Sequence, residues 1–153
     1  KLGPTEVVSR LVEGSFPDYE QIIPQNIKTK IELSTSQFNN AIKMASFFAR
    51  DAANNVKLVF KKPSSGAQTF QIKAVSPQMG DNVSEVETKS SGEEVEIAFN
   101  AKFILDAMPV MGKDKIDLEL AGAMSPAILK PAGEKDYLYI IMPLRMEEWL
   151  IKS

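Results

Sequence analysis

The side chains that could carry out acid–base chemistry in this sequence are carboxylates. The sequence has no histidine and no cysteine, so it lacks the usual general base and the usual thiolate nucleophile. A pair of carboxylates can still act as general acid and general base. The closely spaced acids are Glu93, Glu94 and Glu96, in a strand-and-turn pattern, and Glu147 and Glu148, near the end of the sequence. Neither group lies in a pattern that predicts an apolar pocket.

The sequence also lacks the glycine-rich phosphate-binding motifs and any metal-ligand spacing. We therefore expect a protein that is not an enzyme and that uses no cofactor and no metal. The residues leave one enzymatic alternative open, a carboxylate-dependent hydrolase, in which substitution of Glu94 or Glu96 would abolish activity.

The length and charge of the chain limit which classes of protein remain. A chain of 153 residues fits one domain, with room for a fragment of another. The formal net charge of −2 argues against a surface that is basic throughout, although one face can still be basic. No apolar run approaches the roughly 20 residues that span a membrane, and no signal-peptide pattern is present. We expect a cytoplasmic protein with no membrane partner.

The first half of the sequence predicts strand, helix, strand and strand. VVSRLVEG alternates like a strand, and the proline-containing FPDYEQIIPQN predicts an extended connector. Residues 27–33 predict a half-buried strand, followed by Ser34 or Thr35 as a helix N-cap. VKLVF and TFQIKAV then predict a hairpin. The apolar face of the intervening helix consists of Phe38, Ala41, Ile42, Ala45 and Ala49.

The second half repeats this order. SEVETK and EEVEIAF predict a hairpin around SSG, and Asn100 predicts the N-cap of a helix that Pro109 should shorten or kink. KIDLELA, SPAILKP and DYLYIIM predict three more strands. The apolar stripe of this second helix consists of Phe103, Ile104, Ala107, Met108 and Met111.

The two halves match element by element at an offset of roughly 65 residues, which indicates an internal duplication. Short strands, hairpins and two helices with one apolar face each predict antiparallel sheets with both helices on one side. The predicted fold class is α+β.

Three separated stretches, RLVEGSFPDYEQIIP, FNAKFILD and YIIMPLRM, resemble the bacterial β sliding clamp, the processivity subunit of the replicative DNA polymerase (DNA polymerase III). They occur in the family's order, and the resemblance covers nearly the whole chain. It implies the DNA-clamp fold, in which each domain is itself a duplicated strand–helix–strands unit. The full-length family protein has three such domains, and two subunits form a ring around duplex DNA.

The resemblance also implies a domain layout. Residues 1–21 would be the last strand and exit connector of the second domain, residues 22–146 the third domain, and residues 147–153 a C-terminal extension. The chain would then be the C-terminal portion of a DNA-replication protein that tethers the polymerase to DNA. The alternative is a stand-alone peptide-binding domain of clamp-like fold that never encircles DNA.

In the family, a groove captures short motifs of polymerase subunits, clamp loaders and repair proteins. Pro143 ends strand pairing and methionines adapt to varied apolar partners, which suits such a surface. The alternative for this end of the chain is an ordinary terminal strand that completes the core. Carried over by position, the groove residues are Pro17, Ile22, Asn100, Phe103, Met124, Pro126, Ile140, Met142, Pro143, Leu144, Arg145 and Met146.

Two further sets follow from the resemblance. Lys43, Arg50, Lys102 and Lys113 would face DNA phosphates without reading sequence, unless they form an ordinary solvated helix face. Phe47 and Phe48 would contact another subunit, unless they fill the core of their own domain. Beyond the family motif, Trp149, Leu150 and Ile151 would either pack beside or in the groove or form a frayed tail.

Overall fold

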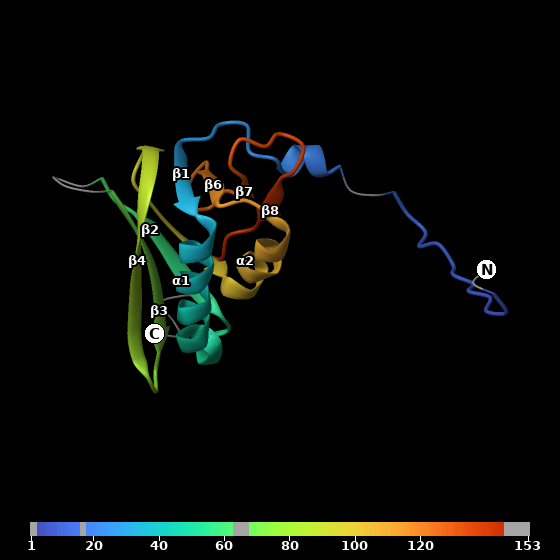
Figure 1. Ribbon diagram of the computed structural model, residues 1–153, viewed down its shortest axis with the longest axis horizontal. Helices are drawn as coiled ribbons and strands as arrows, with labels where there is room; N and C mark the ends of the chain where they lie inside the picture. The colour runs from blue at the N-terminus through green and yellow to red at the C-terminus, as the bar shows by residue number, and fades with distance from the viewer. Residues whose placement is uncertain (1–2, 16–17, 63–67, 146–153) are drawn as a thin grey trace.

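The computed structural model describes residues 3–15, 18–62 and 68–145. Within these ranges the chain forms eight strands, two α-helices and three short 3₁₀ helices (Figure 1). In chain order they are η1 (Tyr19–Ile22), β1 (Thr29–Ser34), α1 (Thr35–Phe48), η2 (Ala49–Ala52), β2 (Asn55–Phe60), β3 (Thr69–Ser76), β4 (Gly80–Gly92), β5 (Val95–Asn100), α2 (Ala101–Ala107), η3 (Met108–Val110), β6 (Lys115–Leu120), β7 (Ala127–Pro131) and β8 (Tyr139–Ile141).

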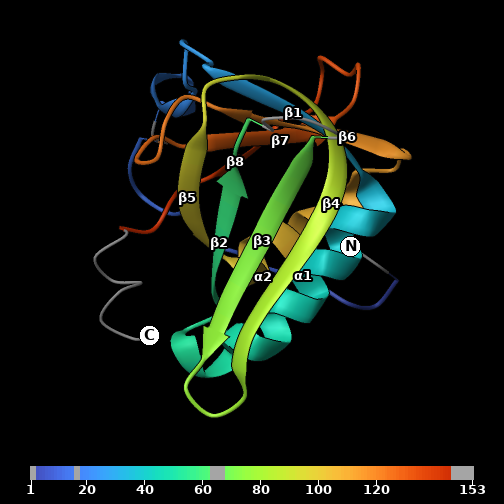
Figure 2. The ribbon, with the colours of Figure 1, turned by 90° about the vertical axis from the view of Figure 1, so that its left-hand side faces the viewer.

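The strands form one antiparallel sheet in the order β5-β2-β3-β4-β1-β6-β7-β8. The sheet curves around α1 and α2, which lie together on its inner side (Figure 2). This arrangement confirms the predicted α+β class and the placement of both helices on one side.

The duplication is visible in the strand pairings. β1 of the first half pairs with β6 of the second half, and β5 of the second half pairs with β2 of the first. The hairpins β2–β3 and β6–β7 correspond, as do the pairs β3–β4 and β7–β8. Each half therefore completes its sheet with a strand of the other half, and neither can bury its apolar faces alone.

The helices begin where the polar caps were expected. Ser34 Oγ accepts a hydrogen bond from the Gln37 N–H at 3.5 Å, and Asn100 Oδ1 accepts one from the Lys102 N–H at 2.9 Å. Pro109 lies in η3, directly after α2 ends at Ala107, because proline cannot continue the α-helical hydrogen bonding. No helix in the described ranges has the length and apolarity needed to cross a membrane.

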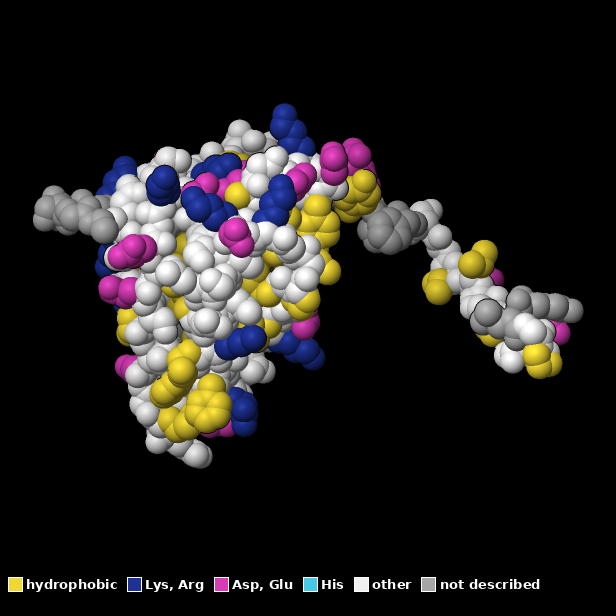
Figure 3. All heavy atoms as spheres, viewed as in Figure 1, with side chains coloured by type: hydrophobic (Ala, Val, Ile, Leu, Met, Phe, Trp, Pro, Cys, Tyr) yellow, Lys and Arg dark blue, Asp and Glu magenta, His cyan; other side chains and the backbone are white. Residues whose placement is uncertain are grey.

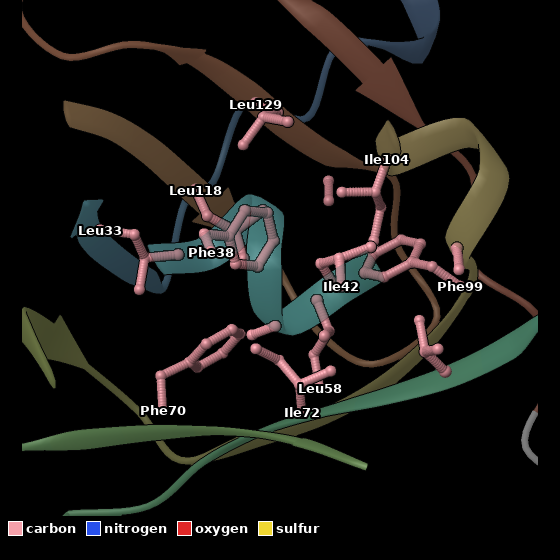
Figure 4. Close-up of a cluster of buried hydrophobic side chains, with 14 of the residues drawn as sticks. Leu33, Phe38, Ile42, Leu58, Phe70, Ile72, Phe99, Ile104, Leu118 and Leu129 are labelled. Atoms are coloured by element: carbon pink, nitrogen blue, oxygen red, sulfur yellow. The ribbon is translucent and has the colours of Figure 1, made fainter. Parts of the chain in front are cut away.

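The core lies between the curved sheet and the two helices (Figure 4). All five predicted apolar positions of the first helix are buried, four in α1 and Ala49 in η2. The ring centroids of Phe38 and Phe70 lie 6.3 Å apart. In α2 the predicted stripe is buried except at Phe103, which is half exposed. The exception has a simple reason: Phe103 lies on the flank of a seven-residue helix that the sheet and α1 cover from one side.

The predicted hairpin between SEVETK and EEVEIAF is wrong. β4 continues through the SSG residues to Gly92, pairing first with β3 and then, from Thr88 to Gly92, with β1. β5 pairs with β2 instead of β4. Alternating polarity identified both segments as strands, but polarity alone does not choose a strand's partner.

The predicted first strand is also absent, since residues 3–15 lie outside the sheet and project from the body of the molecule (Figures 1 and 3). Its apolar side chains Val7, Val8, Leu11 and Val12 are exposed. A strand needs a neighbour to satisfy its backbone groups, and the described chain supplies none here. Within the connector that follows, predicted to be extended, Tyr19–Ile22 instead form the short helix η1, capped by Asp18.

Candidate functional site

The end of β8 differs from its counterpart in the first half of the chain. Pro143 has no N–H, and after it Leu144 makes a single bridge to β5, donating its N–H to the carbonyl oxygen of Ala98 at 2.8 Å. At the corresponding junction, β4 and β1 form a ladder from Thr29–Gly92 to Leu33–Thr88. Over the residues that the structure describes, the junction between β8 and β5 is therefore open, and Met142 beside it is exposed.

Exposed apolar side chains lie on or next to the elements on this side of the molecule. Register places Pro126 beside Met142, since the adjacent residues Ala127 and Ile141 are paired, and α2 contacts β8. Figure 3 shows apolar side chains along the side of the molecule that carries η1, β8 and α2. We call four of these residues the C-terminal apolar surface: Ile22 (47% exposed), Phe103 (50%), Met124 (61%) and Met142 (59%).

This surface can bind but has no reactive groups. Clustered exposed apolar residues on a folded domain mark interaction sites, and methionine side chains accommodate varied apolar partners. The described residues also contain no group of three or more acidic side chains able to hold a metal ion. The arrangement suits an apolar segment of a protein partner.

The other predicted groove residues divide by exposure. Arg145 is exposed, whereas Pro126, Pro143 and Leu144 are half-buried. Ile140 is half-buried in β8, where it pairs with Ile128. Pro17 and Met146 lie outside the described residues.

Asn100 has a structural role that its sequence position alone did not establish. Its Oδ1 caps α2, and its Nδ2 donates to the Ala53 carbonyl at 3.2 Å. Both polar ends of the amide are thus engaged within the fold, so Asn100 positions α2 and with it Phe103.

Tyr139 links β8 to the electrostatics of α2. Burial raises the pKa of its hydroxyl, and the nearby carboxylate of Asp106 and the hydroxyl of Tyr137 raise it further. Tyr137 and Leu138, just before β8, are exposed apolar residues that the sequence interpretation did not include. The apolar run YLYIIM could have indicated them, because it is longer than the three-residue strand that forms and its remaining residues lie outside that strand.

The four predicted DNA-facing residues are not equivalent. Lys43 and Lys102 are exposed on α1 and α2, and Lys43 borders a hollow of about 210 Å³ between the helices. The guanidinium carbon of Arg50 lies 5.2 Å from the centre of the Phe47 ring. Lys113, in the loop after η3, forms an ion pair with Glu134, which neutralises much of its charge.

Phe47 and Phe48 have opposite environments. Phe47 is 51% exposed, whereas Phe48 packs against the core. The two rings meet edge-on with centroids 6.0 Å apart. Met44, one helical turn before Phe47, is exposed as well, and sequence reasoning missed it although the i, i+3 spacing was readable.

The acids considered for catalysis are engaged in structural contacts. Glu94 accepts the backbone N–H of Lys62 at 2.9 Å, and Glu96 pairs with Lys57 at 2.6 Å. The hydrogen bond from Lys57 lowers the pKa of Glu96. Both carboxylates are therefore engaged in contacts within the fold.

Comparison with known proteins gives a consistent result. Residues 20–145 match the family model described as the DNA polymerase III beta subunit, C-terminal domain. Over 146 residues the chain is 34% identical to a beta sliding clamp of Staphylococcus aureus strain Mu50 and 33% identical to one of Staphylococcus epidermidis. The alignments cover 95% of this chain but only 38% of those relatives.

Solved structures show the same similarity. The DNA polymerase III beta subunit of Thermotoga maritima superposes with a TM-score of 0.82 at 32% identity, covering 89% of this chain and 36% of that one. The sliding clamp of Bacillus subtilis superposes with a TM-score of 0.80 at 35% identity, covering 90% and 36%. A clamp of Bartonella birtlesii, solved bound to griselimycin, has a TM-score of 0.79 at 27% identity, covering 90% and 36%.

Proposed function

We propose that this chain, which belongs to the beta sliding clamp family, docks short peptide motifs of replication and repair proteins at the C-terminal apolar surface. The chain matches the C-terminal domain of the DNA polymerase III beta subunit, and the family is non-catalytic. The chain spans 38% of the length of the curated relatives it matches. Ring formation and tethering of a polymerase to DNA are therefore proposed for the larger protein of which such a domain is a part.

The observation that carries the proposal is the open junction between β8 and β5. One backbone bridge, Leu144 to Ala98, holds the chain there, whereas a full ladder closes the corresponding junction of β4 with β1. Met142 directly after β8, Met124 in the loop before β7 and Phe103 on α2, which contacts β8, all carry exposed apolar area. A peptide that buries leucine or phenylalanine side chains there gains about 25 cal/mol per Å² of apolar surface.

The domain layout and the other two surfaces belong to the same proposal. In this proposal, residues 1–21 are the end of a preceding domain. The exposure of Val7, Val8, Leu11 and Val12 supports it, because the rest of that domain would cover these side chains. Residues 22–146 are the C-terminal clamp domain. The remaining residues, 147–153, are an extension.

In the complete ring, the proposal gives this domain two further contacts, one with DNA and one with the neighbouring subunit. Lys43 and Lys102 lie exposed on the helices, where lysines meet phosphates without sequence readout. Lys113 contributes less, because it already forms an ion pair with Glu134, whereas Arg50 keeps its charge while its guanidinium lies over the Phe47 ring. Phe47 contacts the neighbouring subunit, and the partly buried Phe48, whose ring meets that of Phe47 edge-on, supports that contact from its own domain.

The test is fluorescence polarisation with a labelled QLxLF-type peptide. We expect saturable binding to the chain, weakened at least about tenfold in the Met124→Ala, Met142→Ala double variant through loss of buried anchor contacts. Met79→Ala is the matched control, because Met79 is also an exposed methionine but lies in the turn between β3 and β4. Equal binding by the double variant and the control would contradict the proposed site.

A further inference from the structure

Methionine supplies two of the four residues of the C-terminal apolar surface. Met124 is 61% exposed and Met142 is 59% exposed, more than any other methionine among the described residues. A leucine would supply similar apolar area at either position. The methionine side chains differ from leucine in one chemical respect, because their thioether sulfur can be oxidised.

The two methionines lie at the same end of one strand pair. β7 and β8 are antiparallel, with Ala127 opposite Ile141 (Figure 1). Met124 comes three residues before Ala127, and Met142 comes directly after Ile141. Both methionines therefore lie just outside the strands, at the end of the β7–β8 pair that carries the C-terminal apolar surface, and solvent reaches both side chains.

The other described methionines divide into an exposed pair and a buried pair. Met44 on α1 and Met79 in the turn between β3 and β4 are exposed, and neither belongs to the C-terminal apolar surface. Met108 in η3 and Met111 directly after it are buried in the core. Because an oxidant must reach the sulfur, a mild treatment should modify the C-terminal apolar surface and spare the core.

The chemistry needs only a peroxide as oxidant. The sequence has no cysteine, the side chain that peroxides otherwise oxidise most readily. A lone pair of the methionine sulfur attacks one peroxide oxygen, the O–O bond breaks and an S–O bond forms. With hydrogen peroxide the second oxygen leaves as water, so the sulfur loses two electrons and the peroxide gains them. Methionine sulfoxide reductases reverse the change with electrons from thiols, and the sulfoxide oxygen leaves as water.

We propose that Met124 and Met142 are sites of reversible oxidation by peroxide, and that their sulfoxides switch off peptide docking at the C-terminal apolar surface. The second part, the oxidation switch, rests on the proposed function. Oxidation replaces a flexible apolar side chain by a polar one. Burying the sulfoxide oxygen beneath leucine or phenylalanine side chains of a peptide leaves that oxygen without a hydrogen-bond donor, which opposes docking.

Peptide mapping by mass spectrometry after timed exposure to hydrogen peroxide tests the sites. We expect Met124 and Met142 to be oxidised at least about tenfold faster than Met108 and Met111, because the second pair is buried. The oxidised chain should keep the melting temperature of the untreated chain, because the core methionines are spared. Equal oxidation rates for the two pairs would overturn the assignment of the sites.

Peptide binding before and after peroxide treatment tests the oxidation switch. We expect the labelled QLxLF-type peptide to bind the treated chain at least about tenfold more weakly, with recovery after a methionine sulfoxide reductase and thiol are added. Met124→Leu, Met142→Leu should keep its binding after peroxide, because leucine retains the apolar area and has no sulfur. Met44→Leu, Met79→Leu is the matched control, which removes two exposed methionines elsewhere and should remain sensitive.

The comparison isolates the two proposed sites. Met146 is present in the natural chain and in both variants, so it cannot account for a difference between them. A loss of binding after peroxide in Met124→Leu, Met142→Leu as large as in the natural chain would overturn the oxidation switch.

A further pair of substitutions tests the switch without any oxidant. Met124→Gln, Met142→Gln places a polar group of similar length where the sulfoxides would lie. We expect it to bind the peptide at least about tenfold more weakly than Met124→Leu, Met142→Leu, because the amides are costly to bury without partners. The two variants should have similar melting temperatures, because both positions are exposed. Equal peptide binding by the two variants would overturn the switch.

The proposed function and the oxidation switch fail in different ways. Absence of peptide binding by the untreated chain would contradict the proposed function, while the mapped oxidation rates would still decide the sites. Binding by the untreated chain that persists unchanged after Met124 and Met142 are fully oxidised would leave the proposed function standing and overturn the switch.

Discussion

Leu144 donates its backbone N–H to the carbonyl oxygen of Ala98 at 2.8 Å, and this contact joins the two ends of the sheet. β8 and β5 are otherwise the outer strands of the order that begins with β5 and ends with β8. Over the described residues this single bridge brings the two outer strands together at one point and leaves the rest of the junction open.

Two phenylalanines on either side of the α2 N-cap should separate binding from folding. Phe103→Ala should weaken peptide binding about tenfold and change the free energy of unfolding by less than about 1 kcal/mol, because Phe103 is half exposed. Phe99→Ala should cost about 3–5 kcal/mol of stability, because Phe99 is fully buried. Chemical denaturation and polarisation titrations measure both. A loss of stability in Phe103→Ala as large as in Phe99→Ala would place Phe103 in the core.

The adjacent rings of Phe47 and Phe48 should also differ. Phe47→Ala should reduce concentration-dependent self-association in sedimentation velocity, because it removes an exposed aromatic ring. Its cost in stability should be about 1 kcal/mol or less, the size of an exposed contact with Arg50. Phe48→Ala should cost at least about 2 kcal/mol, because Phe48 packs against the core. Equal stability losses would contradict this division of roles.

The ion pair between Lys30 and Asp117 should make the stability of the chain depend on pH in the alkaline range. The atoms lie 2.9 Å apart, and the Asp117 side chain is only 5% exposed. The hydrogen bond from Lys30 to Asp117 raises the pKa of Lys30 above 10.5. A raised lysine pKa contributes stability that is fully present below the unfolded pKa and is lost as pH rises through the folded pKa.

Lys30→Met should therefore destabilise the chain at pH 7 by about 1–2 kcal/mol, a range reduced for the half-exposed lysine. The difference in the free energy of unfolding between Lys30→Met and the natural chain should shrink as pH rises above about 10.5. Urea denaturation at each pH measures this difference. Lys115→Met is the control, because its partner Glu32 is more exposed, and it should cost less than about 1 kcal/mol. A Lys30→Met difference that is constant with pH would refute the assignment.

Gly92, the last residue of β4, should tolerate no side chain. Its φ is +117°, and a Cβ atom there would lie 2.0 Å from the carbonyl oxygen of Lys28. Gly92→Ala should destabilise the chain by more than about 2 kcal/mol, because the β4–β1 junction must shift. Gly133→Ala, at φ +79° with open space around it, should cost only about 1 kcal/mol. Thermal denaturation of the two variants compares them directly, and equal melting temperatures would be inconsistent with a close approach at Gly92.

Sequence patterns predicted local structure well. The buried face of the first helix, from Phe38 in α1 to Ala49 in η2, and the caps at Ser34 and Asn100 are in their expected places. These features depend on residues within a few positions of one another, so periodicity and cap chemistry are sufficient. The family resemblance, carried by motifs at separated positions, is confirmed by the match over residues 20–145.

The sequence by itself thus determined strands β1 to β8, both α-helices, their duplicated order and the family, although it also predicted a strand over VVSRLVEG that does not form. Tertiary structure decided that β4 pairs with β1 instead of β5, and that Phe103 and Phe47 are exposed while Phe99 and Phe48 are covered. The reason is physical: a strand's partner and a side chain's burial depend on residues distant in sequence, and neighbouring residues in a pattern carry no record of them. The open junction at Leu144 arises in the same way, because only the assembled sheet brings the end of the chain to the edge of β5.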